Sequence, residues 1–332
     1  MDRQDAPVRP PAIALSDSPA PNFFIIGAGK TGTTSLHGYL NQHPEIYMSP
    51  VKEPCYFAPE IRTGNFSPGF RGHVQRQTRK LKNILNDGEP VQPLGWIAQD
   101  WDNYLRLFRN VRAEKAIGEA SAAYLWSAAA AANIHAQIPE ARIVMILRDP
   151  AERAFSQYLH QVSVGLTRAS FREHIERALR DPHQHLSIYY PFLEAGLYAA
   201  QVKRFLDLFP RDQVRIYWYE EAWSNPSDLL RDLFQFLEVD PEFQADTTRK
   251  SLERRRPRFA RAHYYLKKFN IWRPLRAMVP ESLRPGLRSA AFRSGSAIKI
   301  DPADRQFLID YYRADVEHLS SMLNRDLSNW LK

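Results

Sequence analysis

The chain has 332 residues, of which 44% are hydrophobic and 25% charged, enough to bury the core of one large domain. Its formal net charge of +8 is compatible with a nucleic acid, an anionic glycan, a membrane surface or a dianionic cofactor as partner, or with a role in solubility alone, and does not decide between them. The single cysteine, Cys55, excludes an intrachain disulfide, and no apolar run reaches the roughly 18 to 20 residues of a membrane-spanning helix.

The first 21 residues are rich in proline, alanine and aspartate and lack a basic segment followed by an apolar run. This composition predicts a disordered tail over residues 1–21 and one folded domain over residues 22–332. Without a signal peptide, and with one cysteine only, the expected compartment is the cytoplasm.

The segment Phe23–Leu36 (FFIIGAGKTGTTSL) predicts a buried strand, a glycine turn with one lysine, and a helix over Thr33–Leu40. Such a turn can hold an oxyanion, because glycines let backbone N–H groups approach it, the helix start carries partial positive charge, and Lys30 adds a full charge. Walker A would need a glycine where Phe24 stands, which disfavours an ordinary nucleoside triphosphatase.

The next segments are predicted in less detail. Ser49–Phe57 (SPVKEPCYF) indicates a loop in which Pro54 biases Glu53 toward an extended backbone, so that Glu53 projects from a loop and does not lie along a helix. Residues 69–91 indicate an exposed insertion, and the aromatics of residues 96–108 have helical spacing typical of a core. The alanine-rich stretch from Ala120 to Ala132 predicts a packed helix.

Residues 143–147 (IVMIL) predict a central parallel strand that leads into a helix. Asp149 can cap that helix, Pro150 suits its first position, and Glu152 completes a capping-box pattern. Arg148 then stands at the carboxyl end of a strand, where it can bind a phosphate, unless it simply pairs with a nearby carboxylate. A Walker-B strand with a magnesium-binding Asp149 is a third, disfavoured interpretation.

Towards the end of the chain, residues 214–219 predict a strand and residues 226–237 an amphipathic helix. Basic residues crowd the segment from Lys250 to Lys268, which is either a solvated face or part of an anion site. Residues 301–323 predict a terminal helix or helix pair.

Two motifs, given below in the order in which they occur along the chain, resemble those of the sulfotransferases that use 3′-phosphoadenosine-5′-phosphosulfate (PAPS). The resemblance is strongest to the heparan sulfate N- and O-sulfotransferases. The motifs are K-T-G-T-T-S-L followed by K-E-P-x-[YF]-F, and the strand that ends in R-D-P-x-x-R-A-x-S-x-Y. The segment E-A-S-A-A-Y-L and the strand end Y-E-E also resemble segments of this family. The resemblance implies a single α/β domain with a mostly parallel sheet flanked by helices, in the P-loop-kinase-like sulfotransferase fold.

The resemblance also implies roles for individual residues. Lys30 would stabilise the leaving phosphate, and Glu53 would be the general base, unless it is only the salt-bridge partner of Lys52 or Lys30. Lys52, Glu119 and Ser121 would lie at the acceptor, although structural hydrogen bonds explain the last two equally well. The expected PAPS-binding residues are Gly29, Lys30, Thr31, Gly32, Thr33, Thr34, Arg148, Ser156 and, from the basic segment, Arg254, Arg255 and Arg256.

The predicted reaction is therefore transfer of the sulfuryl group from PAPS to a hydroxyl or amine of a carbohydrate or small metabolite. No metal ligand pattern is present, so no metal is expected, and no nucleic acid partner is expected either. Two alternatives remain open: a P-loop kinase using ATP and magnesium, and a non-catalytic polyanion-binding protein. The sequence does not identify the acceptor or the oligomeric state.

Overall fold

The computed structural model describes residues 19–62, 66, 100–180, 191–248, 255–257, 259, 262, 264–266, 269, 292–294 and 298–332. The predicted tail falls outside these ranges up to residue 18, and the predicted insertion at 69–91 falls outside them completely.

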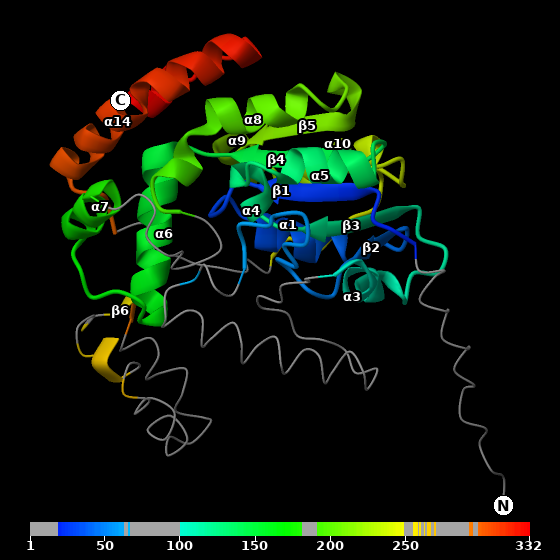
Figure 1. The fold of residues 1–332 in the computed structure, drawn as a ribbon, viewed down its shortest axis with the longest axis horizontal. Coiled ribbons are helices and arrows are strands. Elements are labelled where there is room, and N and C mark those ends of the chain that lie inside the picture. Colours follow the sequence, from blue (N-terminus) through cyan, green and yellow to red (C-terminus); the bar gives the residue numbers. More distant parts are fainter. Residues whose placement is uncertain are drawn as a thin grey trace, which may run out of the picture.

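A sheet of five parallel strands forms the centre of the molecule, in the order β2-β3-β1-β4-β5 (Figure 1). Its strands are β1 (Phe23–Gly27), β2 (Ile46–Met48), β3 (Ala116–Ala120), β4 (Arg142–Leu147) and β5 (Val214–Trp218). Parallel neighbours need crossover connections, and helices supply most of them. The predicted α/β architecture with a mostly parallel sheet is confirmed.

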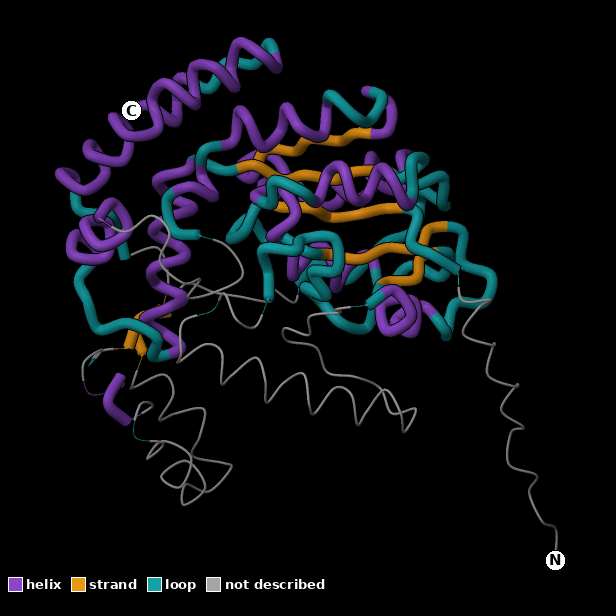
Figure 2. The backbone as a smooth tube through the Cα atoms, in the orientation of Figure 1, coloured by secondary structure: helices purple, strands orange, loops and turns teal. Residues whose placement is uncertain are grey.

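Helices surround this sheet (Figure 2). The α-helices are α1 (Thr33–Leu40), α3 (Trp101–Leu105), α4 (Ala123–Trp126), α5 (Ala130–Gln137), α6 (Pro150–Val164), α7 (Phe171–Arg180), α8 (Tyr198–Leu206), α9 (Tyr219–Ser224), α10 (Pro226–Phe236) and α14 (Pro302–Leu323). Short 3₁₀ helices are η3 (Arg106–Phe108), η4 (Glu194–Gly196), η5 (Arg211–Gln213) and η7 (Ser328–Leu331), and β6 (Arg255–Pro257) pairs antiparallel with β7 (Phe292–Ser294). Among the described residues no helix is both long and apolar enough to cross a bilayer.

Strand β1 shows how the layers form, because its alternate side chains enter two different cores. Phe23 and Ile25 pack with α1 and α10 on one face of the sheet. Phe24 and Ile26 pack on the other face with α4, α5, α6, α8 and α14. Burial on both faces explains why this strand is apolar throughout.

The helix predicted over Ala120–Ala132 is wrong. Strand β3 continues to Ala120, and two separate helices, α4 and α5, follow it. The break falls at Ser127, whose Oγ accepts hydrogen bonds from the N–H groups of Ala129 and Ala130 and so caps α5. Pairing with β1 overrides the helix propensity of alanine at the start of the stretch.

Because all five strands are parallel, the segments that leave their carboxyl ends meet at one edge of the sheet. The glycine turn follows β1, the loop with Glu53 follows β2, Ser121 follows β3, Arg148 follows β4 and Tyr219 follows β5. The topology thus gathers the residues that the two motifs singled out.

Candidate active site

The glycine turn between β1 and α1 has a backbone that only certain residues tolerate. Gly32 stands at the N-cap of α1 with φ 89°, and no side chain caps the helix there. A Cβ on Gly32 would lie 2.4 Å from the Trp223 ring, whose Nε1 donates to the Thr31 carbonyl at 2.9 Å. Glycine at position 32 is therefore required both by backbone conformation and by space.

Lys30 is the charged residue of this turn, and it lies in the left-handed region at φ 71°. Burial, followed by the charges of Arg148, Lys52 and Arg153, lowers the pKa of Lys30 to about 8. Arg148 lies between β4 and α6, Lys52 lies in the loop after β2, and Arg153 belongs to α6. Like charges this close destabilise one another until an anion offsets them, so the arrangement favours binding of an anion.

Arg148 is oriented by three contacts. One Nη donates to the carbonyl of Lys30 at 3.3 Å, the other pairs with Glu152 at 3.3 Å, and the guanidinium lies 4.2 Å from the centre of the Tyr219 ring. Arg148 therefore pairs with a nearby carboxylate and also contacts the glycine turn, while phosphate binding by this residue stays a prediction. Ser156 follows on α6, half-buried, two turns from the helix start.

The cap of α6 agrees with the prediction in part. The Asp149 carboxylate accepts hydrogen bonds from the N–H groups of Ala151 and Glu152, and Pro150 occupies the first turn. The Glu152 side chain departs from the capping-box prediction, because it reaches Arg148 and Arg305. A buried guanidinium competes better for a carboxylate than a backbone N–H group does.

Glu53 lies in the loop after β2 with φ 60°, which is the left-handed region and not the extended backbone that Pro54 predicts. Contacts with the end of β3 fix this conformation: its N–H donates to the Ala120 carbonyl at 2.9 Å, and its Oε2 accepts from the Ala122 N–H at 2.8 Å. Its Oε1 pairs with Lys52. Glu53 is thus held beside a lysine whose charge also acts on Lys30.

Glu119 and Ser121 lie behind this loop and are fully buried. The Ser121 hydroxyl donates to Glu119 at 2.9 Å and accepts from the Cys55 N–H at 3.1 Å. Burial, opposed by hydrogen bonds from Tyr124 and Ser121, raises the pKa of Glu119 to about 8. Both residues therefore make hydrogen bonds that support the loop carrying Glu53, and their place at the acceptor stays a prediction.

The remaining predicted nucleotide ligands come from the basic segment. Arg254 lies outside the described residues, whereas Arg255 and Arg256 belong to β6, which packs beside α6.

Thr33 and Thr34, two further predicted nucleotide ligands, form the first positions of α1, directly after Gly32. In the described part of the chain, no group of three or more His, Cys, Asp or Glu side chains could hold a metal ion.

Sequence analysis missed several neighbours of the site. His160 lies one helical turn beyond Ser156, and burial, followed by the charge of Lys30, lowers its pKa to about 3. Its spacing of four residues from Ser156 was an available signal. Trp223 and Arg305 are distant in sequence from the residues they contact, and no local pattern points to them.

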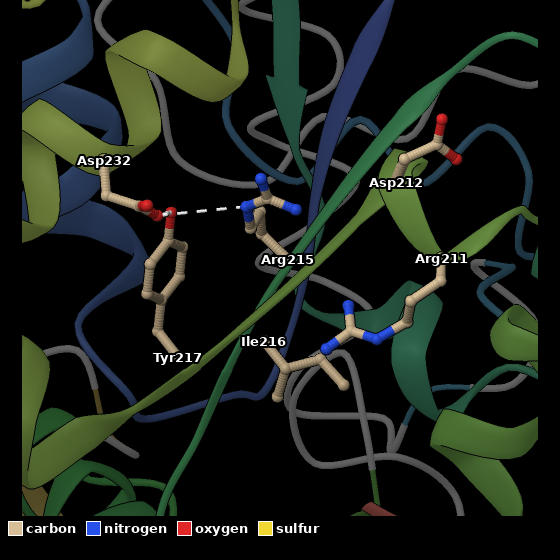
Figure 3. Close-up of a pocket in the computed structure, with 6 residues that line it drawn as sticks. All are labelled: Arg211, Asp212, Arg215, Ile216, Tyr217 and Asp232. Atoms are coloured by element: carbon tan, nitrogen blue, oxygen red, sulfur yellow. Dashed lines mark hydrogen bonds and ion pairs between the residues drawn. The ribbon is translucent and has the colours of Figure 1, made fainter.

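A shallow depression elsewhere on the surface contains two arginines but differs from the candidate site (Figure 3). It lies over β5 and is lined by Arg211, Asp212, Arg215, Ile216, Tyr217 and Asp232. Asp232 accepts a hydrogen bond from Tyr217 at 2.6 Å and lies 4.0 Å from Arg215. Its lining holds two arginines and two aspartates, so it lacks the excess of positive charge found around Lys30.

Comparisons with known proteins place the chain among sulfotransferases. The model of the Sulfotransferase family matches residues 21–245. Carbohydrate sulfotransferase 15 of Mus musculus is 29% identical over 271 residues, which cover 67% of this chain and 44% of that protein. Bifunctional heparan sulfate N-deacetylase/N-sulfotransferase 3 of Homo sapiens is 27% identical over 324 residues, covering 94% of this chain and 31% of that protein.

Among solved structures, a sulfotransferase from Alicyclobacillus acidocaldarius superposes with a TM-score of 0.70 at 31% identity. The match covers 95% of this chain and 100% of the other. In contrast, the chain spans less than half the length of the two curated relatives.

Proposed function

The chain belongs to the sulfotransferase family, and from that premise we propose that it transfers the sulfuryl group of PAPS to a hydroxyl or amine of a carbohydrate acceptor. The observation that carries this proposal is the gathering of Lys30, Lys52 and Arg148 at the carboxyl edge of the sheet, with Glu53 held against Lys52. The names of the relatives support a carbohydrate as the acceptor.

The nucleotide end of the site follows from charge and backbone. The N–H groups at the start of α1, with the hydroxyls of Thr33 and Thr34, bind the 5′-phosphate, because an uncapped helix N-terminus attracts anions. Arg148 and Ser156 bind the 3′-phosphate. Trp223 keeps the turn in its binding conformation by packing on Gly32.

The chemical step needs one cation and one base. PAPS supplies an activated sulfuryl group, whose transfer leaves negative charge on the bridging oxygen of the departing phosphate. Lys30 stabilises that charge, and it loses little hydration in doing so because it is already buried. Glu53 accepts the proton of the acceptor hydroxyl or amine, while its hydrogen bond to Ala122 keeps the carboxylate in place.

The test replaces Glu53 by Gln and measures sulfuryl transfer from radiolabelled PAPS to a panel of glycan acceptors. Turnover is expected to fall about 10² to 10⁴-fold while affinity for 3′-phosphoadenosine 5′-phosphate (PAP) stays unchanged, because only the base is lost. Glu45→Gln is the matched control. Glu45 also pairs with a lysine, Lys115, but it directly precedes β2, at the end of the strand opposite to the loop that carries Glu53.

Two results would contradict the proposal. Near-normal turnover of Glu53→Gln at saturating acceptor would remove Glu53 as the base. Phosphoryl transfer from ATP that EDTA abolishes, with none from PAPS, would identify a kinase instead.

A further inference from the structure

Arg305 links the C-terminal helix to the start of α6. It lies in the first turn of α14, and its guanidinium donates to Asp149 Oδ2 at 2.9 Å. A second nitrogen lies 3.9 Å from Glu152 Oε1, and Nε donates to the carbonyl of Lys332 at 3.0 Å. Helix α14 packs against α6, and Figure 1 shows it passing the end of α6 that follows β4. The hydrogen bond to the Lys332 carbonyl therefore helps to orient the Arg305 guanidinium towards Asp149 and Glu152.

Arg148 and Arg305 share Glu152, and Arg305 also pairs with Asp149. Glu152 contacts Arg148 through Oε2 at 3.3 Å and faces Arg305 through Oε1, so the side chains alternate in charge. Arg148 and Asp149 are 7% and 8% exposed, which leaves little solvent to screen them. The charge of Arg305 also opposes the rise that burial causes in the pKa of Asp149.

The direction of the effect follows from the charge balance. Without Arg305, two carboxylates would remain beside one arginine, and Glu152 would bind Arg148 more strongly. The same negative charge would repel a phosphate that approaches Arg148. A cation that offsets the carboxylates therefore releases Arg148 for a second anion.

We propose that Arg305 is a positioning residue that acts through Glu152 and Asp149 to make Arg148 available to the 3′-phosphate of the nucleotide. The proposal rests on the proposed function, because it assumes that a 3′-phosphorylated nucleotide binds. It assigns a role at the nucleotide site to α14, which lies beyond the residues 21–245 that the family model covers.

The test compares PAP with adenosine 5′-monophosphate, which lacks the 3′-phosphate, by titration calorimetry. Arg305→Gln is expected to weaken PAP binding about tenfold and to leave binding of the monophosphate unchanged, since only the 3′-phosphate meets Arg148. Arg305→Lys keeps the charge and should restore part of the preference. Arg313→Gln is the matched control, because Arg313 lies on the same helix and pairs only with the exposed Asp310 among the contacts described.

The double variant Glu152→Gln/Arg305→Gln separates charge from structure. It should recover part of the lost preference for PAP, because one of the carboxylates that Arg305 offsets is gone. Thermal melts of all variants check that the fold is intact.

Three results would overturn the inference. One is an equal loss of affinity for both nucleotides in Arg305→Gln, which identifies a structural residue. A second is an unchanged preference for PAP in Arg305→Gln while Arg148→Ala abolishes it, which leaves the proposed function standing. If the wild-type protein itself does not prefer PAP over the monophosphate, the proposed function fails together with the inference.

Discussion

Two residues proposed for catalysis, Lys30 and Glu53, both have a left-handed backbone, which is uncommon outside glycine. Each is held there by its surroundings: the Lys30 carbonyl accepts from Arg148, and the Glu53 N–H donates to Ala120. Such backbone strain is frequent where side chains must point in a fixed direction. For Lys30 the surroundings also set the charge state, because its pKa lies near 8.

This pKa predicts that nucleotide binding takes up a proton in alkaline solution. Bound phosphates stabilise the charged amine, so they raise the pKa of Lys30 above its value of about 8 in the free protein. Between about pH 7, where the phosphates of PAP are already ionised, and pH 8, affinity for PAP should change little, and above pH 8 it should fall by up to about tenfold per pH unit. Calorimetry in buffers of different ionisation enthalpy measures the proton uptake.

The control for this prediction is Lys30→Met, which removes the titrating amine. Proton uptake should vanish in that variant between pH 8 and 9, a window set by the pKa of Lys30. Undiminished uptake would mean that another group titrates.

Among the elements, α9 has an influence that its six residues do not suggest. Its Trp223 covers Gly32 and bonds to Thr31, so it shapes the turn between β1 and α1. The sequence placed a strand end and the motif Y-E-E in this region without indicating that the following tryptophan reaches the turn. Helix α9 thus packs against the glycine turn through Trp223 and fixes the position of its backbone.

Replacing Gly32 by Ala tests this packing. The added Cβ meets the Trp223 ring at 2.4 Å and φ is 89°, so we expect a loss of about 1 to 3 kcal/mol in the free energy of unfolding, together with weaker nucleotide binding. Gly38→Ala, on the same helix, meets nothing within 4 Å and should stabilise by up to about 1 kcal/mol. Urea titrations measure both variants; equal stabilities would contradict the prediction.

The elements also show what could be predicted from the sequence. Local signals were sufficient for α1 at Thr33–Leu40 and for the Asp149 cap, because caps, glycines and apolar runs act over a few residues. Local signals failed over Ala120–Ala132. Pairing with β1 makes Ala120 part of a strand, and the hydrogen bonds of Ser127 separate the remaining residues into two helices.

In the candidate site, too, some features follow from local sequence and others depend on tertiary packing. The positions of Lys30, Glu53 and Arg148 followed from motifs in two short segments. The contact from Arg305 to Asp149 joins residues 156 positions apart, and it depends on how α14 packs against α6. The burial that shifts the pKa of Glu119 is likewise a tertiary property.

At the scale of the whole molecule, the stability of the fold is linked to pH through buried groups such as Glu119. Its pKa is raised from 4.5 to about 8 by burial, so the folded state holds a proton that the unfolded chain releases earlier. The stabilisation is complete below pH 4.5 and is lost as the pH rises towards 8.

Glu119→Gln should remove this dependence. The wild type should lose stability relative to the variant by up to about 1.4 kcal/mol per pH unit between the two pKa values. Chemical denaturation at several pH values measures the difference. Glu45→Gln is the control, because the hydrogen bond from Lys115 lowers the pKa of Glu45 and burial does not raise it above its usual value. A difference that does not vary with pH would show that Glu119 is ionised in the folded state.

The position of β1 in the sheet has a consequence for biosynthesis. Both of its neighbours, β3 and β4, come later in the chain, so the ribosome delivers Phe23–Gly27 well before any partner strand exists. Pairing over such sequence separations is slow, and unpaired apolar strands aggregate. In the nascent chain this buried apolar strand therefore has no partner until β3 emerges and only one partner until β4 emerges, which leaves it open to aggregation during synthesis.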